Sequence, residues 1–244
     1  MREGGLKAKK KHDIYSIMLG RNITYILVLF CIQTYAQKTL EFNHLLEYKF
    51  KLRHADSVWK TQYILINSED NSYYAEFARK DSIKSKLTLI DFNGLTSDVF
   101  LNYKDIIDAD SIIFDCKYIY ELSNRYAYQG KNYDFSKLND TIINNFRLSH
   151  YILKSNKPRR ERRKKLHTLH YLIDETIFVQ KPFFRTPTAY YSWQLDEIFP
   201  DNLFIEKYYL DFSGTRKMRE HKLISVRKIS KLFVIPAECA YSNN

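Results

Sequence analysis

Alternation of apolar and polar residues runs through most of the chain after residue 37 and predicts strands. The clearest run covers residues 111–123, where Ile112, Phe114, Cys116 and three further apolar residues alternate with mainly charged or polar ones. Strands with one buried face and one solvent-exposed face are typical of an antiparallel sheet. Noisier runs of the same period cover residues 47–54, 60–67, 72–79, 86–92, 98–103, 148–154, 166–173, 203–212 and 221–229.

Turn residues between these runs support the pairing of neighbouring strands. Asn93-Gly94 separates two apolar runs and predicts a type I′ hairpin, because both residues readily adopt positive φ angles. Residues 68–71, 129–132 and 213–214 occupy equivalent places. All three glycines after residue 37 are thereby explained as turn residues, and none remains for a glycine-rich phosphate loop.

Helical patterns are confined to residues 40–46, 136–146 and 192–198, the second with Asp140 as its expected N-cap. No helix alternates regularly with the strands, so a parallel α/β sheet is disfavoured. Apolar residues make up 45% and aromatic residues 16% of the chain, enough for a substantial core. We therefore expect a mainly β (α+β) fold: a curved, mostly antiparallel sheet or sandwich with one to three covering helices.

In the first 36 residues a charged region, an apolar region and a cleavage site follow one another as in a secretory signal peptide. An uncharged apolar run at residues 23–32 follows Arg21, and the small residues Thr34 and Ala36 precede a cleavage point before Gln37. The run is shorter than the about 20 residues that cross a bilayer, although a buried strand or an uncleaved anchor is the alternative interpretation. We predict that residues 1–36 are removed and that residues 37–244 form a single β-rich domain.

Met18 would start a compact leader, and we expect it to be the true initiator. The predicted location is therefore the periplasm, the outer-membrane surface or the medium, with no membrane span in the mature chain. Cys116 and Cys239 are the cysteines left after cleavage. They can pair as a disulfide in an oxidising compartment, or Cys116 can stay a free thiol on the apolar face of its strand.

The formal charge of +11 arises from two places, the leader and one basic run. Residues 154–165 hold eight Lys and Arg residues, one Glu and Pro158, and we predict a solvated loop there. On an exported protein this run would dock on an anionic envelope surface or bind nothing, and no nucleic acid is expected. The candidate anion-binding residues are Arg159, Arg160, Arg162, Arg163, Lys164 and Lys165.

Aromatic residues are dense between residues 183 and 212. They can line a pocket for an acyl chain or a sugar, because ligand pockets have largely apolar and aromatic walls, or they can fill the core. The candidate ligand-binding residues are Tyr190, Tyr191, Trp193, Phe204 and Tyr208.

No motif assigns a catalytic residue, a metal site or a cofactor. His167 and His170 form H-x-x-H, but on a strand positions three apart point to opposite faces, and no third ligand accompanies them. Asp105, Asp108 and Asp110 lack the glycine and the distal glutamate of a calcium loop. GxSxG, P-loop, GxGxxG and CxxC motifs are missing from the sequence.

Several short segments resemble small exported β-rich proteins of Bacteroidota. They are the Tyr-Ala-Gln cleavage site and residues 46–50, 66–74 and 205–215. The opening hairpins are similar to the GLPGLI-type group, although its Gly-Leu-Pro-Gly-Leu-Ile segment is missing. The late turn and Lys/Arg-rich strand are similar to LolA-like lipoprotein carriers, which implies a curved antiparallel sheet able to hold acyl chains. The resemblance covers about half of the chain and transfers no catalytic residue.

The leading hypothesis is a non-enzymatic envelope or periplasmic protein that binds an apolar or envelope ligand, such as a lipid, on the concave side of its sheet. One alternative is a secreted hydrolase with a site around His150, His167 or His170. Another is an adaptor that docks residues 154–165 on an anionic surface.

Overall fold

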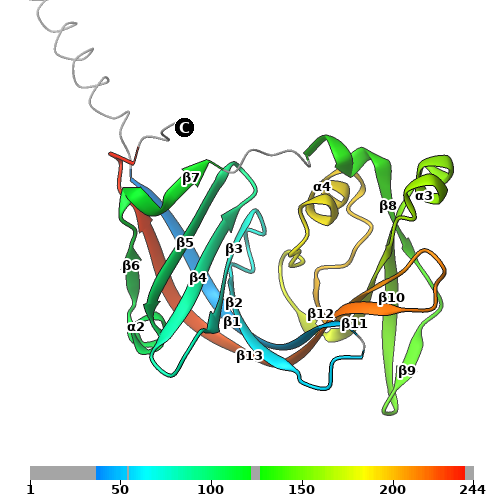
Figure 1. The fold of residues 1–244 in the computed structure, drawn as a ribbon, viewed down its shortest axis with the longest axis horizontal. Coiled ribbons are helices and arrows are strands. Elements are labelled where there is room, and N and C mark those ends of the chain that lie inside the picture. The colour runs from blue at the N-terminus through cyan, green and yellow to red at the C-terminus, as the bar shows by residue number, and fades with distance from the viewer. Residues whose placement is uncertain (1–36, 54, 122–126, 240–244) are drawn as a thin grey trace, which may run out of the picture.

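The computed structural model describes residues 37–53, 55–121 and 127–239. The expected signal peptide, residues 1–36, lies outside the described residues. The fold is mainly β, with a large curved and mostly antiparallel sheet and a few short helices (Figure 1), as the sequence predicts. In chain order the elements are β1 (Lys38–Arg53), β2 (Lys60–Ile66), β3 (Tyr73–Arg79), β4 (Lys84–Asp91), β5 (Leu95–Asn102), α2 (Tyr103–Asp108), β6 (Ser111–Ile113), the 3-10 turn η2 (Cys116–Tyr118), β7 (Ile119–Glu121), the 3-10 turn η3 (Ala127–Asn132), β8 (Tyr133–Lys137), β9 (Thr141–Ile143), β10 (Phe146–Ser155), α3 (Pro158–Lys164), β11 (Thr168–Phe178), α4 (Pro187–Asp196), β12 (Asn202–Leu210) and β13 (Lys217–Ile235).

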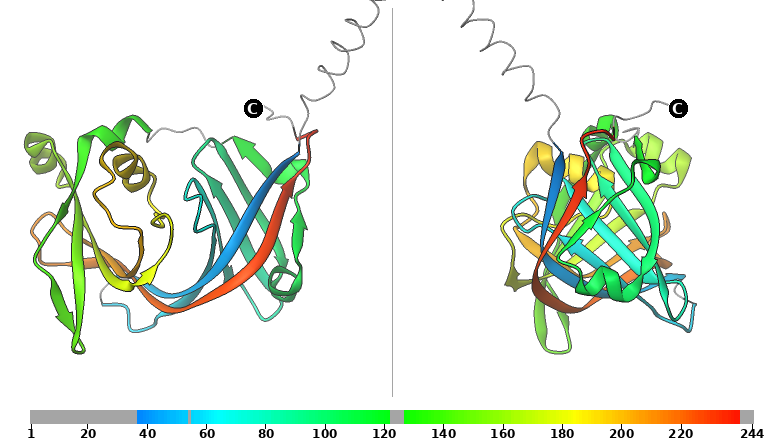
Figure 2. Two further views of the ribbon diagram at one scale, coloured as in Figure 1. Left: turned by 180° about the vertical axis from the view of Figure 1, so that it is seen from behind. Right: turned by 90° about the vertical axis from the view of Figure 1, so that its left-hand side faces the viewer.

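Two long antiparallel strands, β1 and β13, run through the whole sheet and connect its two halves (Figure 2). The strand order is β7-β5-β4-β3-β2-β1-β13-β12-β11-β10-β8, and β9 pairs with β10. The β1–β13 register shifts between Phe42 and His44 and again between Glu47 and Tyr48, and at each shift β13 has one residue more than β1, which marks a bulge in β13. Bulges bend a strand and increase its twist, so they let β1 and β13 follow the curvature of the sheet.

The β2–β7 half of the sheet curls until β6 meets β13 in the one parallel pairing among the described strands. Its interior holds alternate residues of each strand, among them the buried Phe42, Phe77, Leu87 and Phe233. A disulfide between Cys116 in η2 and Cys239, just beyond β13, ties the end of the chain to the linker between β6 and β7.

The β8–β12 half carries the segment 179–186 and α4 on its concave side. A second and larger core lies there, built from aromatic side chains such as Tyr171, Phe184, Phe199 and Phe204. β1, β2 and β3 also supply residues to this core from the face opposite the first core. These strands are therefore buried on both faces, which blurs the alternation in their sequences.

Two predicted helices are strands in the structure. Residues 40–46 belong to β1, where the pairing with β13 is irregular after Phe42 and the buried positions change phase, so the spacing of apolar residues resembles that of a helix. Residues 136–146 contain the last two residues of β8, all of β9 and the turn into β10. Asn144 and Asn145 form that turn, and both have positive φ, as in a two-residue type I′ hairpin. Asp140 does not cap a helix; it accepts a hydrogen bond from Arg147 at 2.6 Å.

The long strand predicted at residues 111–123, of which 122 and 123 lie outside the described residues, is wrong over residues 111–121. It splits into β6 and β7, separated by η2, where the Asp115 side chain accepts from the Lys117 backbone N–H. The predicted loop at residues 154–165 contains α3, whose first helical residue is Pro158 and whose C-cap, Lys165, is left-handed. The third predicted helix, residues 192–198, corresponds to α4, which begins five residues earlier at Pro187.

The glycines differ in their roles. Gly94 closes the β4–β5 hairpin with φ of 113°, but the loop has three residues, so the predicted two-residue turn type is wrong. Gly214 is a turn residue with φ of 73°. Gly130 instead permits a close approach, because a Cβ there would lie 2.7 Å from the Tyr191 Cβ in α4. Within the described part of the chain, no helix has the length and apolar character that a membrane crossing requires.

Candidate functional site

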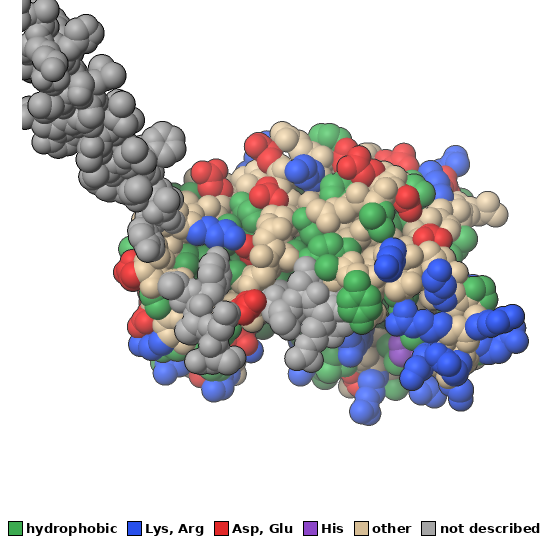
Figure 3. Space-filling view, turned by 90° about the horizontal axis from the view of Figure 1, so that it is seen from above, with side chains coloured by type: hydrophobic (Ala, Val, Ile, Leu, Met, Phe, Trp, Pro, Cys, Tyr) green, Lys and Arg blue, Asp and Glu red, His purple; other side chains and the backbone are tan. Residues whose placement is uncertain are grey.

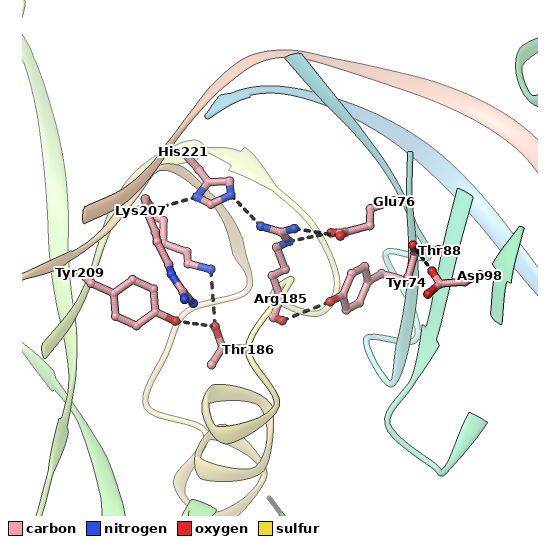
Figure 4. Close-up of polar contacts among 10 residues, drawn as sticks. Tyr74, Glu76, Thr88, Asp98, Arg185, Thr186, Lys207, Tyr209 and His221 are labelled. Atoms are coloured by element: carbon pink, nitrogen blue, oxygen red, sulfur yellow. Dashed lines mark hydrogen bonds and ion pairs between the residues drawn. The ribbon is translucent and has the colours of Figure 1, made fainter. Parts of the chain in front are cut away.

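A cavity of about 330 Å³ opens on the concave side of the sheet, where its two halves meet. It lies between β3 and β4 on one side, β12 and β13 on the other, and the segment that leads into α4 (Figure 4). Two Arg side chains, one Lys and one His line it, but only a single carboxylate does. The lining residues are Tyr74, Glu76, Ile90, Arg185, Thr186, Pro187, Lys207, Tyr209, Arg219 and His221.

The strand register places Lys207 next to His221. Lys207 in β12 lies directly opposite His221 in β13 and opposite Tyr171 in β11, so the three residues form one row across the sheet. A bulge between Phe204 and Glu206 places both Phe204 and Lys207 on the concave face. Lys207 therefore lies among aromatic side chains on the concave face of the sheet.

A second irregularity adds Arg219 to the rim of the cavity. The β12–β13 register shifts between Lys207 and Tyr209, and Arg219 has φ of 49°. A side-chain-bearing residue in this left-handed region costs about 1–2 kcal/mol. Bulges next to functional sites re-aim side chains, and strained residues cluster there, so the conformation of Arg219 supports a role for this cavity.

Arg185 is the most extensively bonded group in the cavity. Its Nε and Nη2 donate to the two carboxylate oxygens of Glu76 at 2.6 and 2.8 Å, in the bidentate geometry that guanidinium groups favour. Its Nη1 donates to His221 Nε2 at 2.8 Å. Burial lowers the pKa of Arg185, but the hydrogen bonds and charge of Glu76 outweigh burial and raise it above its ordinary value. Arg185 is therefore a fixed cation.

His221 is held in its neutral form with one tautomer. A guanidinium only donates, so Nε2 of His221 accepts from Arg185, and Nδ1–H donates to the Arg219 carbonyl at 3.0 Å. Burial, followed by the charges of Lys207 and Arg185, lowers the pKa of His221 to about 2. His221 supplies no charge to the cavity and orients its two arginine neighbours.

Lys207 has the least compensated charge in the cavity. The residue is 3% exposed, and within the described chain its Nζ has one hydrogen-bond partner, the Thr186 hydroxyl, at 3.5 Å, and no carboxylate at ion-pair distance. Burial lowers the pKa of Lys207 to about 7, and the nearby Arg185 and Arg219 lower it further than Glu76 raises it. Near neutral pH the amine is therefore divided between its two protonation states.

Several hydroxyl groups lie in or beside the cavity. Thr186 Oγ1 lies 3.2 Å from Tyr209 Oη, and the Tyr74 hydroxyl donates to the Arg185 carbonyl at 3.2 Å. The Tyr171 hydroxyl is fully buried beside Thr186 but makes no hydrogen bond of normal geometry within the described chain. The cavity can thus offer several hydrogen bonds and positive charge to an anionic group.

The five aromatic ligand-binding candidates are not brought together around a cavity. Tyr190, Trp193 and Phe204 fill the larger core with exposures of 9% or less, which corresponds to the core alternative of the sequence interpretation. Tyr191 donates to the Phe92 carbonyl at 2.6 Å. Tyr208 points to the opposite face of the sheet, where it stacks on His170. Of the five, Phe204 is near the cavity: its ring centre lies 5.9 Å from the Lys207 Nζ.

The six anion-binding candidates lie on or just after α3. Lys and Arg side chains gather at the end of the molecule where this helix lies (Figure 3). The acidic residue of α3, Glu161, contacts Lys154 at 3.6 Å, on the adjacent strand β10. The basic side chains Arg159, Arg160, Arg162, Arg163, Lys164 and Lys165 form a surface that we call the α3 patch.

Two of the three histidines proposed for a hydrolase site meet each other. His150 Nε2 and His170 Nδ1 lie 2.9 Å apart, and burial lowers the pKa of His170 to about 4. Neither ring is hydrogen-bonded to a hydroxyl, thiol or carboxylate in the described chain, and His167 is exposed and separate. The described residues contain no group of three or more His, Cys, Asp or Glu that could hold a metal ion.

Sequence reasoning missed the cavity because its charged residues come from four distant segments. Glu76 and Arg185 are 109 residues apart, and the bulges that direct Lys207 and Arg219 have no signature in the sequence. One local signal was present: Lys207 interrupts the apolar strand pattern of residues 203–212. A lysine within such a pattern lies either at the edge of a sheet or in the interior beside a charged partner, because lysine is almost never fully buried without one.

Neither a protein-family model nor a curated protein matches the sequence. Among solved structures, the chain is similar to the MucA/MucB complex of Pseudomonas aeruginosa, with a TM-score of 0.41 and 7% identity over 78% of this chain and 52% of that one. For a crystal structure of MucB the TM-score is 0.39 and the sequence identity is 7%, and the match covers 78% of this chain and 54% of that one.

A putative outer membrane lipoprotein-sorting protein domain from Vibrio parahaemolyticus gives a TM-score of 0.32 and 8% identity, over 77% of this chain and 85% of that one. The chain spans about half the length of the MucB chains that it matches. Likeness at this level leaves the function to be argued from the residues of this chain.

Proposed function

We propose that the chain is an exported binding protein of the periplasm or envelope, and that its concave cavity holds a small ligand with an anionic group. The observation that carries the proposal is Lys207, a buried amine that faces a cavity and has no carboxylate partner in the described chain. A buried charge without a partner is strongly unfavourable, and an anionic ligand would supply the missing partner.

The size and lining of the cavity indicate the class of ligand. About 330 Å³ is at the small end of the range for ligand pockets, which fits a small organic acid or a phosphate-bearing headgroup. Ile90, Pro187 and the Tyr209 ring can contact a short apolar part. We do not propose an acyl chain bound through the aromatic segment, because Tyr190, Trp193 and Phe204 are packed in the core.

Export is the second part of the proposal. It is supported by the leader-like order of residues 1–36 and by the pairing of Cys116 with Cys239, since disulfides persist in oxidising compartments. N-terminal sequencing of material purified from the producing cell tests it. A first residue at Gln37 supports export, whereas an intact N-terminus on cytosolic protein contradicts it.

Calorimetric titration with a panel of small carboxylates and phosphates tests ligand binding. Lys207→Met removes the cation and nearly preserves the side-chain length, and Arg219→Asn removes the rim charge with a residue that tolerates the left-handed conformation. Lys49→Met, at an exposed position of β1, is the matched control. We expect wild type and the control to bind alike and both cavity variants to lose about tenfold or more in affinity, equivalent to about 1.4 kcal/mol. Equal affinity in all four proteins would contradict the proposal.

Docking on an anionic surface through the α3 patch is the second candidate function. It is favoured by a run of exposed basic side chains on one short helix whose single acid is already engaged. Sedimentation with vesicles containing phosphatidylglycerol at low salt tests it, because such binding is screened by salt. Replacing Arg159, Arg160, Arg162 and Arg163 by Glu should abolish binding. Undiminished binding by this variant would count against the candidate.

A further inference from the structure

The surroundings of Lys207 suit a nucleophile as well as a simple cation. Within the described residues its Nζ has one hydrogen-bond contact, 3.5 Å to Thr186 Oγ1, and no ion pair holds the nitrogen in place. The two arginines that line the same cavity oppose a positive charge on it. Lysines become nucleophiles in proteins by this combination of burial and neighbouring cations.

Proton-transfer groups lie next to the amine. The hydroxyls of Tyr209 and Thr186 are 3.2 Å apart, and the Thr186 hydroxyl is also the group that contacts Lys207 (Figure 4). The three groups form a chain from phenol to alcohol to amine. Such a chain can carry a proton to and from a group that reacts at the nitrogen.

The other charged residues of the cavity favour a ligand that has a carboxylate next to its carbonyl carbon. Arg219 lines the rim, and Arg185 lies deeper with its position fixed by Glu76 and His221. Cations in the same cavity as a nucleophilic amine would orient a carboxylate bonded to a carbonyl carbon.

We propose that Lys207 captures a 2-oxo acid in the cavity as a reversible imine. This inference rests on the proposed function, because the carboxylate of the 2-oxo acid would occupy the anion site. The Nζ lone pair forms a bond to the carbonyl carbon as the C=O π bond breaks, and one proton passes from Nζ to the carbonyl oxygen through the Thr186 hydroxyl to give a carbinolamine. The second Nζ proton then reaches the hydroxyl by the same route, the C–O bond breaks with loss of water, and the C=N bond of the imine forms. No oxidant or reductant is consumed.

Reductive trapping tests the inference. The intact protein is incubated with pyruvate at pH 7 and sodium cyanoborohydride, and the lysine that carries the adduct is identified by peptide mass spectrometry. We expect labelling of Lys207 about tenfold or more above that of exposed lysines such as Lys49. Lys207→Arg, which keeps the charge but cannot form an imine, should lose this adduct and keep the labelling of the other lysines. Lactate, which replaces the carbonyl with a hydroxyl, should compete without being trapped.

The outcomes separate this inference from the proposed function. If lactate and pyruvate bind reversibly and Lys207 is labelled no faster than Lys49, imine capture is overturned and the anion site stands. If neither acid binds and no selective adduct forms, both proposals fail for this ligand class. Equal labelling of wild type and Lys207→Arg at the same peptides also overturns the inference.

Discussion

Replacing Lys207 by Met should stabilise the protein, by an amount that depends on pH. The amine is 3% exposed and faces Arg185, Arg219 and the neutral His221, with Glu76 already held by Arg185. Burial, then the charge of Arg185, lowers its pKa to about 7. Met has a similar length and no charge, so it removes the unfavourable ionisation and keeps most of the packing.

The size of the effect follows from the difference between folded and unfolded pKa values. An unfolded lysine titrates near 10.4, and each unit of depression corresponds to about 1.4 kcal/mol. The penalty is fully present below pH 7 and is relieved as the pH rises from 7 toward 10.4, because the unfolded chain then binds more protons than the folded one. It amounts to about 4 kcal/mol at pH 7 and about 2 kcal/mol at pH 9.

Urea unfolding of wild type and Lys207→Met at pH 7 and pH 9 measures this difference. We expect the variant to be more stable by about 4 kcal/mol at pH 7 and by about half as much at pH 9. Lys49→Met, in an exposed strand position, should change little at either pH. A variant that is destabilised at pH 7, or whose advantage does not shrink with pH, would refute the reasoning. A bound anion should reduce the advantage, because it stabilises the charged amine.

Three further predictions concern other parts of the fold. Reducing the Cys116–Cys239 disulfide, which joins residues 123 apart, should lower the unfolding free energy by about 5 kcal/mol, measured by denaturation with and without reductant; no change would contradict it. Glu76→Gln should destabilise by about 3 kcal/mol because it leaves Arg185 without its counterion, and adding Arg185→Met should recover part of the loss in a double-mutant cycle. The folded pKa of His170, about 4, is below its unfolded value, so stability should fall as the pH drops from 6.5 to 4; His170→Gln should remove about 2 kcal/mol of that fall, and an unchanged acid-unfolding curve would count against it.

The sequence predicted where strands exist better than where they bend. Period-two patterns located most strands and the overall class of fold, because one buried face imposes that period. The pattern failed at residues 40–46, where an irregular pairing with β13 shifts the buried phase of β1. It also failed at residues 111–121, where the chain leaves β13 and crosses to β5 through a 3-10 turn. These changes arise from long-range pairing, which local periodicity does not record.

Charge composition identified the α3 patch but not the cavity. A dense basic run must be solvated, so its exposure was predictable, and Pro158 at its first helical position was an unused sign of a helix. The site around Lys207 depends on single charged residues in β3, β12, β13 and the segment before α4. Each looks ordinary within its own segment, and only the strand register brings them together.

The pairing of β1 with β13 has a consequence for how the chain acquires its structure. Lys38, at the start of β1, lies opposite Ile235, at the end of β13, so one edge of β1 has no partner until β13 has been synthesised. During synthesis that edge would be open to pairing with other chains. We therefore expect slow maturation, sensitive to truncation at the C-terminus and dependent on chaperones that shield nascent strands.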